Sequence, residues 1–156
     1  MTERVVGIVV TGESVTVVDA QVPAAKDQPI TIFSDTTWSL QDGNRGSALS
    51  FLHQRCADYL REHHINSVVI KASAMPMGTV KMAILHSAEV RGVVIAAAGS
   101  VCPVVLLQKA LISRTFGERK VDEYLKDDDF WGDQVQGTMR KTSREAAMQI
   151  IAARNR

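Results

Sequence analysis

The sequence predicts a single α/β domain over residues 1–156, built on a mixed five-stranded sheet with helices on both faces. Three β-branched runs near the N-terminus lie close enough in sequence to form an antiparallel meander. Two later apolar runs each follow a segment with helical periodicity, so the strands that they form should be parallel. Neither repeats nor a low-complexity linker interrupts the chain, which favours one domain.

The predicted meander begins with Arg4–Val10, a run of β-branched residues typical of a strand buried on both faces. Turn residues separate it from a second strand, Val15–Ala20. The third strand is Ile30–Ser34, and Trp38–Leu40 extends or follows it. The two parallel strands are Ser67–Ile70 and Pro103–Leu107.

Two helices are predicted between these strands. The first, Ser47–His63, is amphipathic, and one face carries Leu49, Leu52, Cys56, Tyr59 and Leu60. The second, Thr79–Ser100, is expected to be a long and mostly buried core helix, capped by Thr79 and ended by a left-handed Gly99. The run Val93–Ile95 leaves an alternative open, in which a strand begins there and the helix stops near Gly92.

The C-terminal part is predicted to be helical on both sides of an acidic loop. One helix begins within Gln108–Arg114 or only after Gly117, and Glu118–Lys126 has helical periodicity. Asp127–Gly132 is interpreted as a solvated loop, because its acids lack the spacing of a calcium loop. The last helix is Thr142–Arg154, in which Thr142 and Glu145 match a capping box.

Net charge, cysteine content and the absence of common motifs argue against several classes of function. The net charge of +1 gives the whole molecule no strong attraction for nucleic acid or anionic lipid, so a polyanion site would have to be a local patch. The N-terminal residues MTERVVGIVV lack the features of a secretory signal, and we expect no membrane span. Cys56 and Cys102 do not form a metal-type pair, and a buried free thiol at Cys56 suits a cytoplasmic protein. Phosphate-loop, dinucleotide and nucleophile-elbow motifs are absent.

Several short segments, taken in order, resemble one family. They are Val6-Gly7-Ile8 on the first strand, Val68-Val69-Ile70 on the fourth, Ala88–Ala98 in the central helix, Pro103-Val104 on the fifth strand, and Arg144–Ala147 in the last helix. Together they span most of the chain and resemble the RuvC-type Holliday-junction resolvases of the ribonuclease-H-like superfamily. The resemblance implies a ribonuclease-H-like sheet, three antiparallel strands followed by two parallel ones.

The resemblance also implies magnesium-dependent phosphodiester hydrolysis, with carboxylates holding two ions. Carried over residue by residue, the acidic positions of the family fall at degenerate positions of this sequence: Val9, Lys71 or Ala72, Thr142 and Glu145. Val9 offers no side-chain oxygen, and Lys71 would place an ammonium where a dication should lie. We therefore expect no catalytic residue, no metal site and no cofactor. A nuclease with a metal site rearranged around other acids, such as Glu13, Asp19 or Glu89, is an alternative, and magnesium would bind only in that case.

Two functional hypotheses follow. In the first, the chain is a catalytically inactive, nucleic-acid-binding accessory module, whose candidate contacts are Lys71, Lys81, Arg114, Arg119, Lys120 and Arg144. In the second, it is a homodimeric interaction or scaffold domain without a nucleic-acid role, since the resemblance implies dimers. Trp38, Phe130 and Trp131 are the candidate anchors of that interface.

Overall fold

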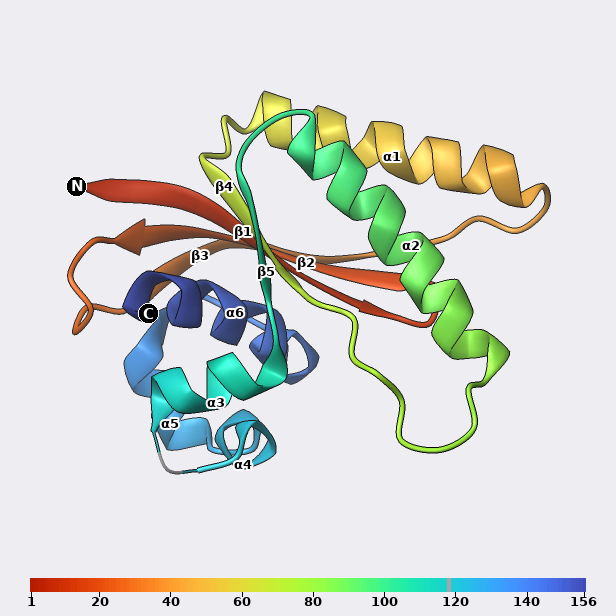
Figure 1. Cartoon of the computed structure of the whole chain (residues 1–156). Coiled ribbons are helices and arrows are strands. Elements are labelled where there is room, and N and C mark those ends of the chain that lie inside the picture. Colours follow the sequence, from red (N-terminus) through yellow and green to blue (C-terminus); the bar gives the residue numbers. More distant parts are fainter. Residues whose placement is uncertain (118) are drawn as a thin grey trace.

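A six-stranded mixed sheet forms the centre of the computed structural model, which describes residues 1–117 and 119–156 (Figure 1). The strand order is β5-β4-β1-β2-β3-β6. The first three strands are antiparallel, whereas β4 is parallel to β1 and β5 is parallel to β4, which confirms the predicted fold class. The strands are β1 (Thr2–Thr11), β2 (Ser14–Pro23), β3 (Ile30–Ser39), β4 (Ser67–Lys71), β5 (Val104–Leu107) and β6 (Val135–Gln136).

β6 is the strand that the sequence did not predict. It has two residues and runs parallel to β3 at the edge of the sheet. Two residues are too few to show the alternation from which a strand is recognised. β3 is also longer than the predicted Ile30–Ser34, because it continues without a break through Trp38.

The helices cover both faces of the sheet (Figure 1). α1 (Arg45–Glu62) and α2 (Met82–Gly99) lie on one face, over an apolar cluster that includes Val6, Ile8 and Ile70. The remaining helices lie on the opposite face, over a second cluster that includes Val5, Val9 and Val69. They are α3 (Lys109–Phe116), α4 (Val121–Leu125), α5 (Asp128–Gln134) and α6 (Arg144–Asn155). The strict alternation of side chains along β1 therefore supplies both cores.

Gly7, in the middle of β1, sets the distance between the sheet and α6. A Cβ built at Gly7 would lie 2.3 Å from the carbonyl oxygen of Ala146 and 2.9 Å from Cγ1 of Ile150. Any larger residue would push α6 away from the sheet. The glycine thus lets the first turn of α6 lie directly over the strands.

α2 departs from its predicted form in three ways. Its first residue is Met82, preceded by Lys81 without a side-chain cap, so Thr79 does not cap it. Gly99 ends the helix without a positive φ, and no strand begins at Val93. The helix is not mostly buried either, since its buried residues begin only at Val90: Val90, Val94, Ala97 and Ala98. The apolar side chains of Met82, Ile84 and Leu85 in its first turns are exposed.

By length and composition alone, α2 is the one helix among the described residues that would suffice to cross a bilayer. From Val90 onward this helix packs against the sheet. Val90 and Val94 are fully buried against the sheet, and Arg91 donates to the carbonyl oxygen of Val10 at 3.2 Å. These contacts fix α2 to the end of β1.

Most of the acidic segment Asp127–Gly132 is helical, since α5 begins at Asp128, and the prediction of a loop is wrong. The Asp127 carboxylate accepts from the backbone N–H of Phe130 at 3.0 Å and caps α5. Trp131 is buried, and its indole N–H donates to the carbonyl oxygen of Tyr124 at 2.9 Å. Burial of that indole stabilises a turn whose sequence is otherwise acidic.

The sequence left two possible helix starts, one within Gln108–Arg114 and one after Gly117. The structure has a helix at each place, α3 before Gly117 and α4 after it. The end of α3 coincides with Gly117, whose φ of +118° suits glycine. Of the predicted helix Glu118–Lys126, the structure contains Val121–Leu125, and Glu118 lies outside the described residues.

The predicted capping box before the last helix is absent. A 3-10 turn, Lys141–Ser143, precedes α6, and Thr142 is exposed within that turn without capping it. Glu145 points instead toward β4, where its carboxylate forms an ion pair with Lys71. A charged partner in another element thus replaces the local hydrogen bond that the motif predicts.

Candidate functional site

The positions that the family resemblance singles out meet at one end of the sheet. Ile8 of β1 is in register with Ile70 of β4, so Val9 and Lys71 are neighbours on adjacent parallel strands. Both side chains point to the α6 face, as the alternation along each strand requires. α6 begins at Arg144, and its first turn brings Glu145 over the same strands. The fold therefore gathers Val9, Lys71 and Glu145 in one place.

An ion pair between Lys71 and Glu145 occupies this place. The Lys71 ammonium contacts the Glu145 carboxylate, and the two side chains are 29% and 26% exposed. Partial burial strengthens the attraction between the charges relative to a pair in open solvent. The ammonium supplies the positive charge that balances the carboxylate.

Magnesium does not fit the donor set found here. The ion needs several oxygen ligands, but the side chains of Val9 and Ala72 are aliphatic and that of Lys71 ends in an ammonium, so none of the three supplies an oxygen. The Ala72 N–H is already bonded to the carbonyl oxygen of Leu107 at 2.9 Å. Within residues 1–117 and 119–156, no group of three or more His, Cys, Asp or Glu side chains could hold a metal.

The acids considered for a rearranged site lie elsewhere. Glu13 and Glu89 each lie 3.6 Å from the guanidinium of Arg45, between the β1–β2 turn and the two helices α1 and α2. Asp19 is fully buried on the α1 side of the sheet. None of the three faces the α6 side on which Lys71 and Glu145 meet.

Asp19 belongs to a buried polar network instead. Its carboxylate accepts two hydrogen bonds from Arg4, at 2.9 and 2.8 Å, and one from the Tyr59 hydroxyl at 2.6 Å. Burial of Tyr59, together with its bond to this carboxylate, raises the pKa of the phenol to about 12. The network is fully satisfied and joins β1, β2 and α1, which is a structural role.

A second cluster, which the sequence did not reveal, fixes the start of α6. The Asp35 carboxylate on β3 accepts from the Ser143 hydroxyl at 2.5 Å and from the backbone N–H and guanidinium of Arg140 at 2.8 to 3.1 Å. Burial opposes ionisation of Asp35, but the bonds from Arg140 and Ser143 hold its pKa below the ordinary value. Such a contact joins distant residues, so no local motif signals it.

The cationic candidates fall into two groups. Arg119 pairs with Asp127 at 2.9 Å and lies over the ring of Tyr124, while Arg144 is only 11% exposed and bonds to Asp128 at 2.8 Å. These two arginines hold the C-terminal helices together. The other exposed candidates are Lys81, Arg114 and Lys120.

The aromatic anchors expected for a dimer are covered. Trp38 is 3% exposed and Trp131 is 4% exposed, and Phe130 packs against the rings of its neighbours. Exposed apolar side chains gather instead on the loop before α2 and on its first turns. This group, the α2 apolar surface, consists of Met75, Met77, Val80, Met82, Ile84 and Leu85.

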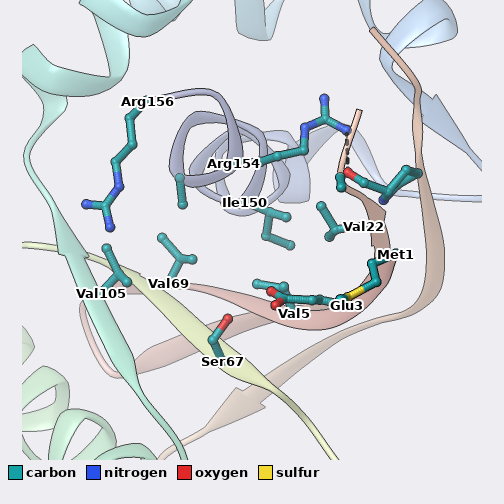
Figure 2. A pocket seen from close by; sticks show the side chains of 13 residues that line it. Met1, Glu3, Val5, Val22, Ser67, Val69, Val105, Ile150, Arg154 and Arg156 are labelled. Atoms are coloured by element: carbon teal, nitrogen blue, oxygen red, sulfur yellow. Dashed lines mark hydrogen bonds between the residues drawn. The ribbon is translucent and has the colours of Figure 1, made fainter. Parts of the chain in front are cut away.

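A cavity of about 530 Å³ lies toward the other end of the same strands (Figure 2). Val5, Val69 and Val105 line it from three neighbouring strands, and Ile150 lines it from α6. Arg154 is committed to the chain itself, donating to the carbonyl oxygen of Gln28 at 2.8 Å. This cavity is separate from the Lys71–Glu145 pair, which is not among its lining residues.

Comparison with known proteins gives matches in structure but not in sequence. No family model matches the chain, and no curated protein does. The structure of RuvC from Thermus thermophilus is similar, with a TM-score of 0.74 and 12% identity over 97% of this chain and 92% of that one. RuvC from T. thermophilus in complex with a Holliday junction substrate gives 0.69 and 12%, over 97% and 91%.

The yeast mitochondrial Holliday junction resolvase Ydc2 is also similar, with a TM-score of 0.62 and 11% identity over 98% of this chain and 79% of that one. At these identities the likeness is one of fold. The chain therefore has a RuvC-like ribonuclease-H fold, as the sequence resemblance predicted.

Proposed function

We propose that this chain is a catalytically inactive RuvC-like domain that binds nucleic acid as an accessory module. The observation that carries the proposal is the ion pair between Lys71 and Glu145. In the family that the sequence resembles, this end of the sheet holds metal ions on carboxylates. Here an ammonium from β4 neutralises the one carboxylate that remains, so the charge that would attract a metal ion is already balanced.

Binding without cleavage is consistent with the same geometry. A lysine ammonium has three N–H donors, and one contact to Glu145 leaves others for a phosphate oxygen. A structurally similar protein, T. thermophilus RuvC, has been solved with a Holliday junction substrate. The exposed Lys81, Arg114 and Lys120 would add contacts to the phosphate backbone, which do not depend on base sequence.

The binding test uses fluorescein-labelled four-way junction, duplex and single-stranded DNA, followed by fluorescence anisotropy in EDTA. We expect at least one of these substrates to bind without a divalent ion, and the affinity to fall steeply between 50 and 200 mM salt, by about tenfold or more. Lys71→Gln should weaken binding about three- to tenfold. Lys26→Gln, which alters a lysine bonded to the carbonyl oxygen of Asn155, is the matched control and should leave binding unchanged.

The inactivity is tested separately by incubating the same substrates with Mg²⁺ or Mn²⁺. We expect no cleavage product above a blank without protein. Cleavage that disappears in Glu145→Ala would contradict the inactive assignment, and absence of binding to every substrate would contradict the nucleic-acid role.

The alternative function, a homodimeric scaffold, is supported by the α2 apolar surface. Met77 and Met82 are more than half exposed, and an apolar patch of this kind commonly marks a protein interface. For this alternative, analytical ultracentrifugation should show a dimer that persists in high salt and dissociates in Leu85→Glu. A monomer at all concentrations would rule it out, and DNA binding by the monomer would favour the first function.

A further inference from the structure

The outer edge of β3 is open along most of its length. β6 pairs with β3 only at Ile30 and Thr31. At Gly137, which has a φ of +96°, the strand pairing ends, and a Cβ built there would lie 3.0 Å from the carbonyl oxygen of Ile32. Arg140 then lies beside β3, where it donates to the side chains of Asp35 and Thr37. In the part of the chain that the structure describes, no strand pairs with this side of β3 from Phe33 to Ser39. Unpaired peptide groups of this kind can template another strand.

A groove of about 470 Å³ lies beside that edge, between β3 and α1. Thr36 and Trp38 of β3 line it on one side. On the other side, α1 presents a stripe whose members are three or four residues apart and therefore share one side of the helix. The stripe consists of Phe51, Gln54, Arg55, Asp58 and Glu62, and Tyr59 lies beside it.

A β-bulge directs the strand side chains into this groove. The register between β2 and β3 shifts so that Asp19 pairs with Ser34 while Ala20 pairs with Ile32, which leaves Phe33 between them. As a result Ser34, Thr36 and Trp38 face α1, and the Ser34 hydroxyl lies 2.8 Å from that of Tyr59. The bulge thus turns Trp38 toward α1, so that Trp38 and Tyr59 line the groove beside the unpaired edge of β3.

The chemistry of the groove is apolar at one end and acidic at the other. The Phe51 ring is 50% exposed, although it lines the groove together with the buried Trp38. The Arg55 guanidinium lies 5.1 Å from the centre of the Trp38 ring, so its charge is held over that aromatic face. Asp58 and Glu62 follow one and two helical turns later, and Asp58 also lies 3.9 Å from the Arg61 guanidinium.

We propose that an extended segment of a partner protein binds in this groove as an added strand. Its backbone would pair with the open edge of β3, and every second side chain would enter the groove below α1. An apolar side chain would cover Phe51 and Trp38, and a basic side chain would lie near Asp58 and Glu62. In this mode of recognition, hydrogen bonds between the backbones contribute affinity, and contacts of the side chains in the groove determine sequence specificity. The site lies on the opposite face and at the opposite side of the sheet from Lys71.

The experiment pans the full chain with a phage-displayed library of random twelve-residue peptides. We expect enriched peptides to alternate apolar with other residues and to carry a lysine or arginine. Phe51→Glu should weaken their binding by tenfold or more, because it places a carboxylate on the apolar part of the groove. The matched control is Leu106→Glu on β5, the opposite edge strand, where the wild-type side chain is 47% exposed. It should leave binding unchanged.

Backbone pairing is tested by N-methylating alternate peptide bonds of an enriched peptide, which removes the N–H donors. One of the two methylated sets should lose binding by tenfold or more, and the other should retain it. Failure to enrich any peptide that distinguishes wild type from Phe51→Glu would overturn the proposal. Equal binding of both methylated sets would also overturn it, and so would self-association of the chain that Phe51→Glu abolishes, because the edge would then pair two copies.

Discussion

Lys71, the last residue of β4, forms an ion pair with Glu145 in the first turn of α6. The two residues are distant in sequence, and the pair joins the sheet to the helix that covers it. Val9, the neighbour of Lys71 on β1, packs in the same apolar cluster as Ala146. The site is therefore a packed junction between elements, and its charges balance within the chain.

The first prediction concerns this pair. Lys71→Met should lower the free energy of unfolding at pH 7 by about 1 kcal/mol, because it leaves the partly buried Glu145 carboxylate without its cation. Urea unfolding of Lys71→Met, Glu145→Gln and the double variant gives the coupling energy between the two side chains. The double variant should be more stable than the sum of the single losses implies. Strictly additive losses would show that the pair contributes no coupling.

The second prediction concerns the contact between β1 and α6. Gly7→Ala should lower the free energy of unfolding by about 2 kcal/mol or more, since its methyl group would meet the backbone of Ala146. The matched control is Gly92→Ala in α2, where the added Cβ would meet no atom within 4 Å apart from its chain neighbours and the backbone of its own helix. That change should be neutral or stabilise the protein by up to about 1 kcal/mol. Equal effects of the two changes in thermal unfolding would refute the close packing of α6.

The third prediction concerns pH. The bonds from Arg140 and Ser143 hold the pKa of Asp35 below its ordinary value, despite the opposing effect of burial. Its stabilising contribution is therefore complete above the unfolded pKa near 3.8 and is lost as the pH falls through the lower folded pKa. The stability difference between wild type and Asp35→Asn, measured in urea, should be constant from pH 7 to about 5 and shrink below about 4. A difference that grows on acidification would contradict this sign.

The fourth prediction concerns the two thiols. Burial, with a smaller contribution from Cys102, raises the pKa of Cys56 to about 12, and Cys56 is fully buried. At pH 8 a disulfide reagent such as DTNB should label native protein at Cys102 first and reach Cys56 only in urea. Cys102→Ser should then lose the rapid phase. Rapid labelling of Cys56 in folded Cys102→Ser would show that the α1 face opens.

Local sequence patterns predicted most strands and helices of the sheet core, because strands and amphipathic helices each have a characteristic hydrophobic periodicity. The β-branched run of β1 and the alternating order of later elements were sufficient for the fold class. Prediction from local patterns failed where a contact with a residue distant in sequence determines the local structure. Asp127–Gly132 has the composition of a loop, but burial of Trp131 makes it a helix. Thr142 and Glu145 match a cap, but Lys71 draws the Glu145 carboxylate to the sheet.

The sequence by itself determined that the cluster of carboxylates implied by the family resemblance is incomplete, since the side chains of Val9 and Lys71 offer no oxygen ligand. Only the tertiary structure decided what replaces it, because an ion pair between β4 and α6 requires both elements to be placed within contact distance. The open edge of β3 is likewise a property of the assembled sheet. The outer edge of β3 is unpaired beyond Thr31 because β6 pairs only with Ile30 and Thr31. The sequence of β3 itself does not predict where that pairing ends.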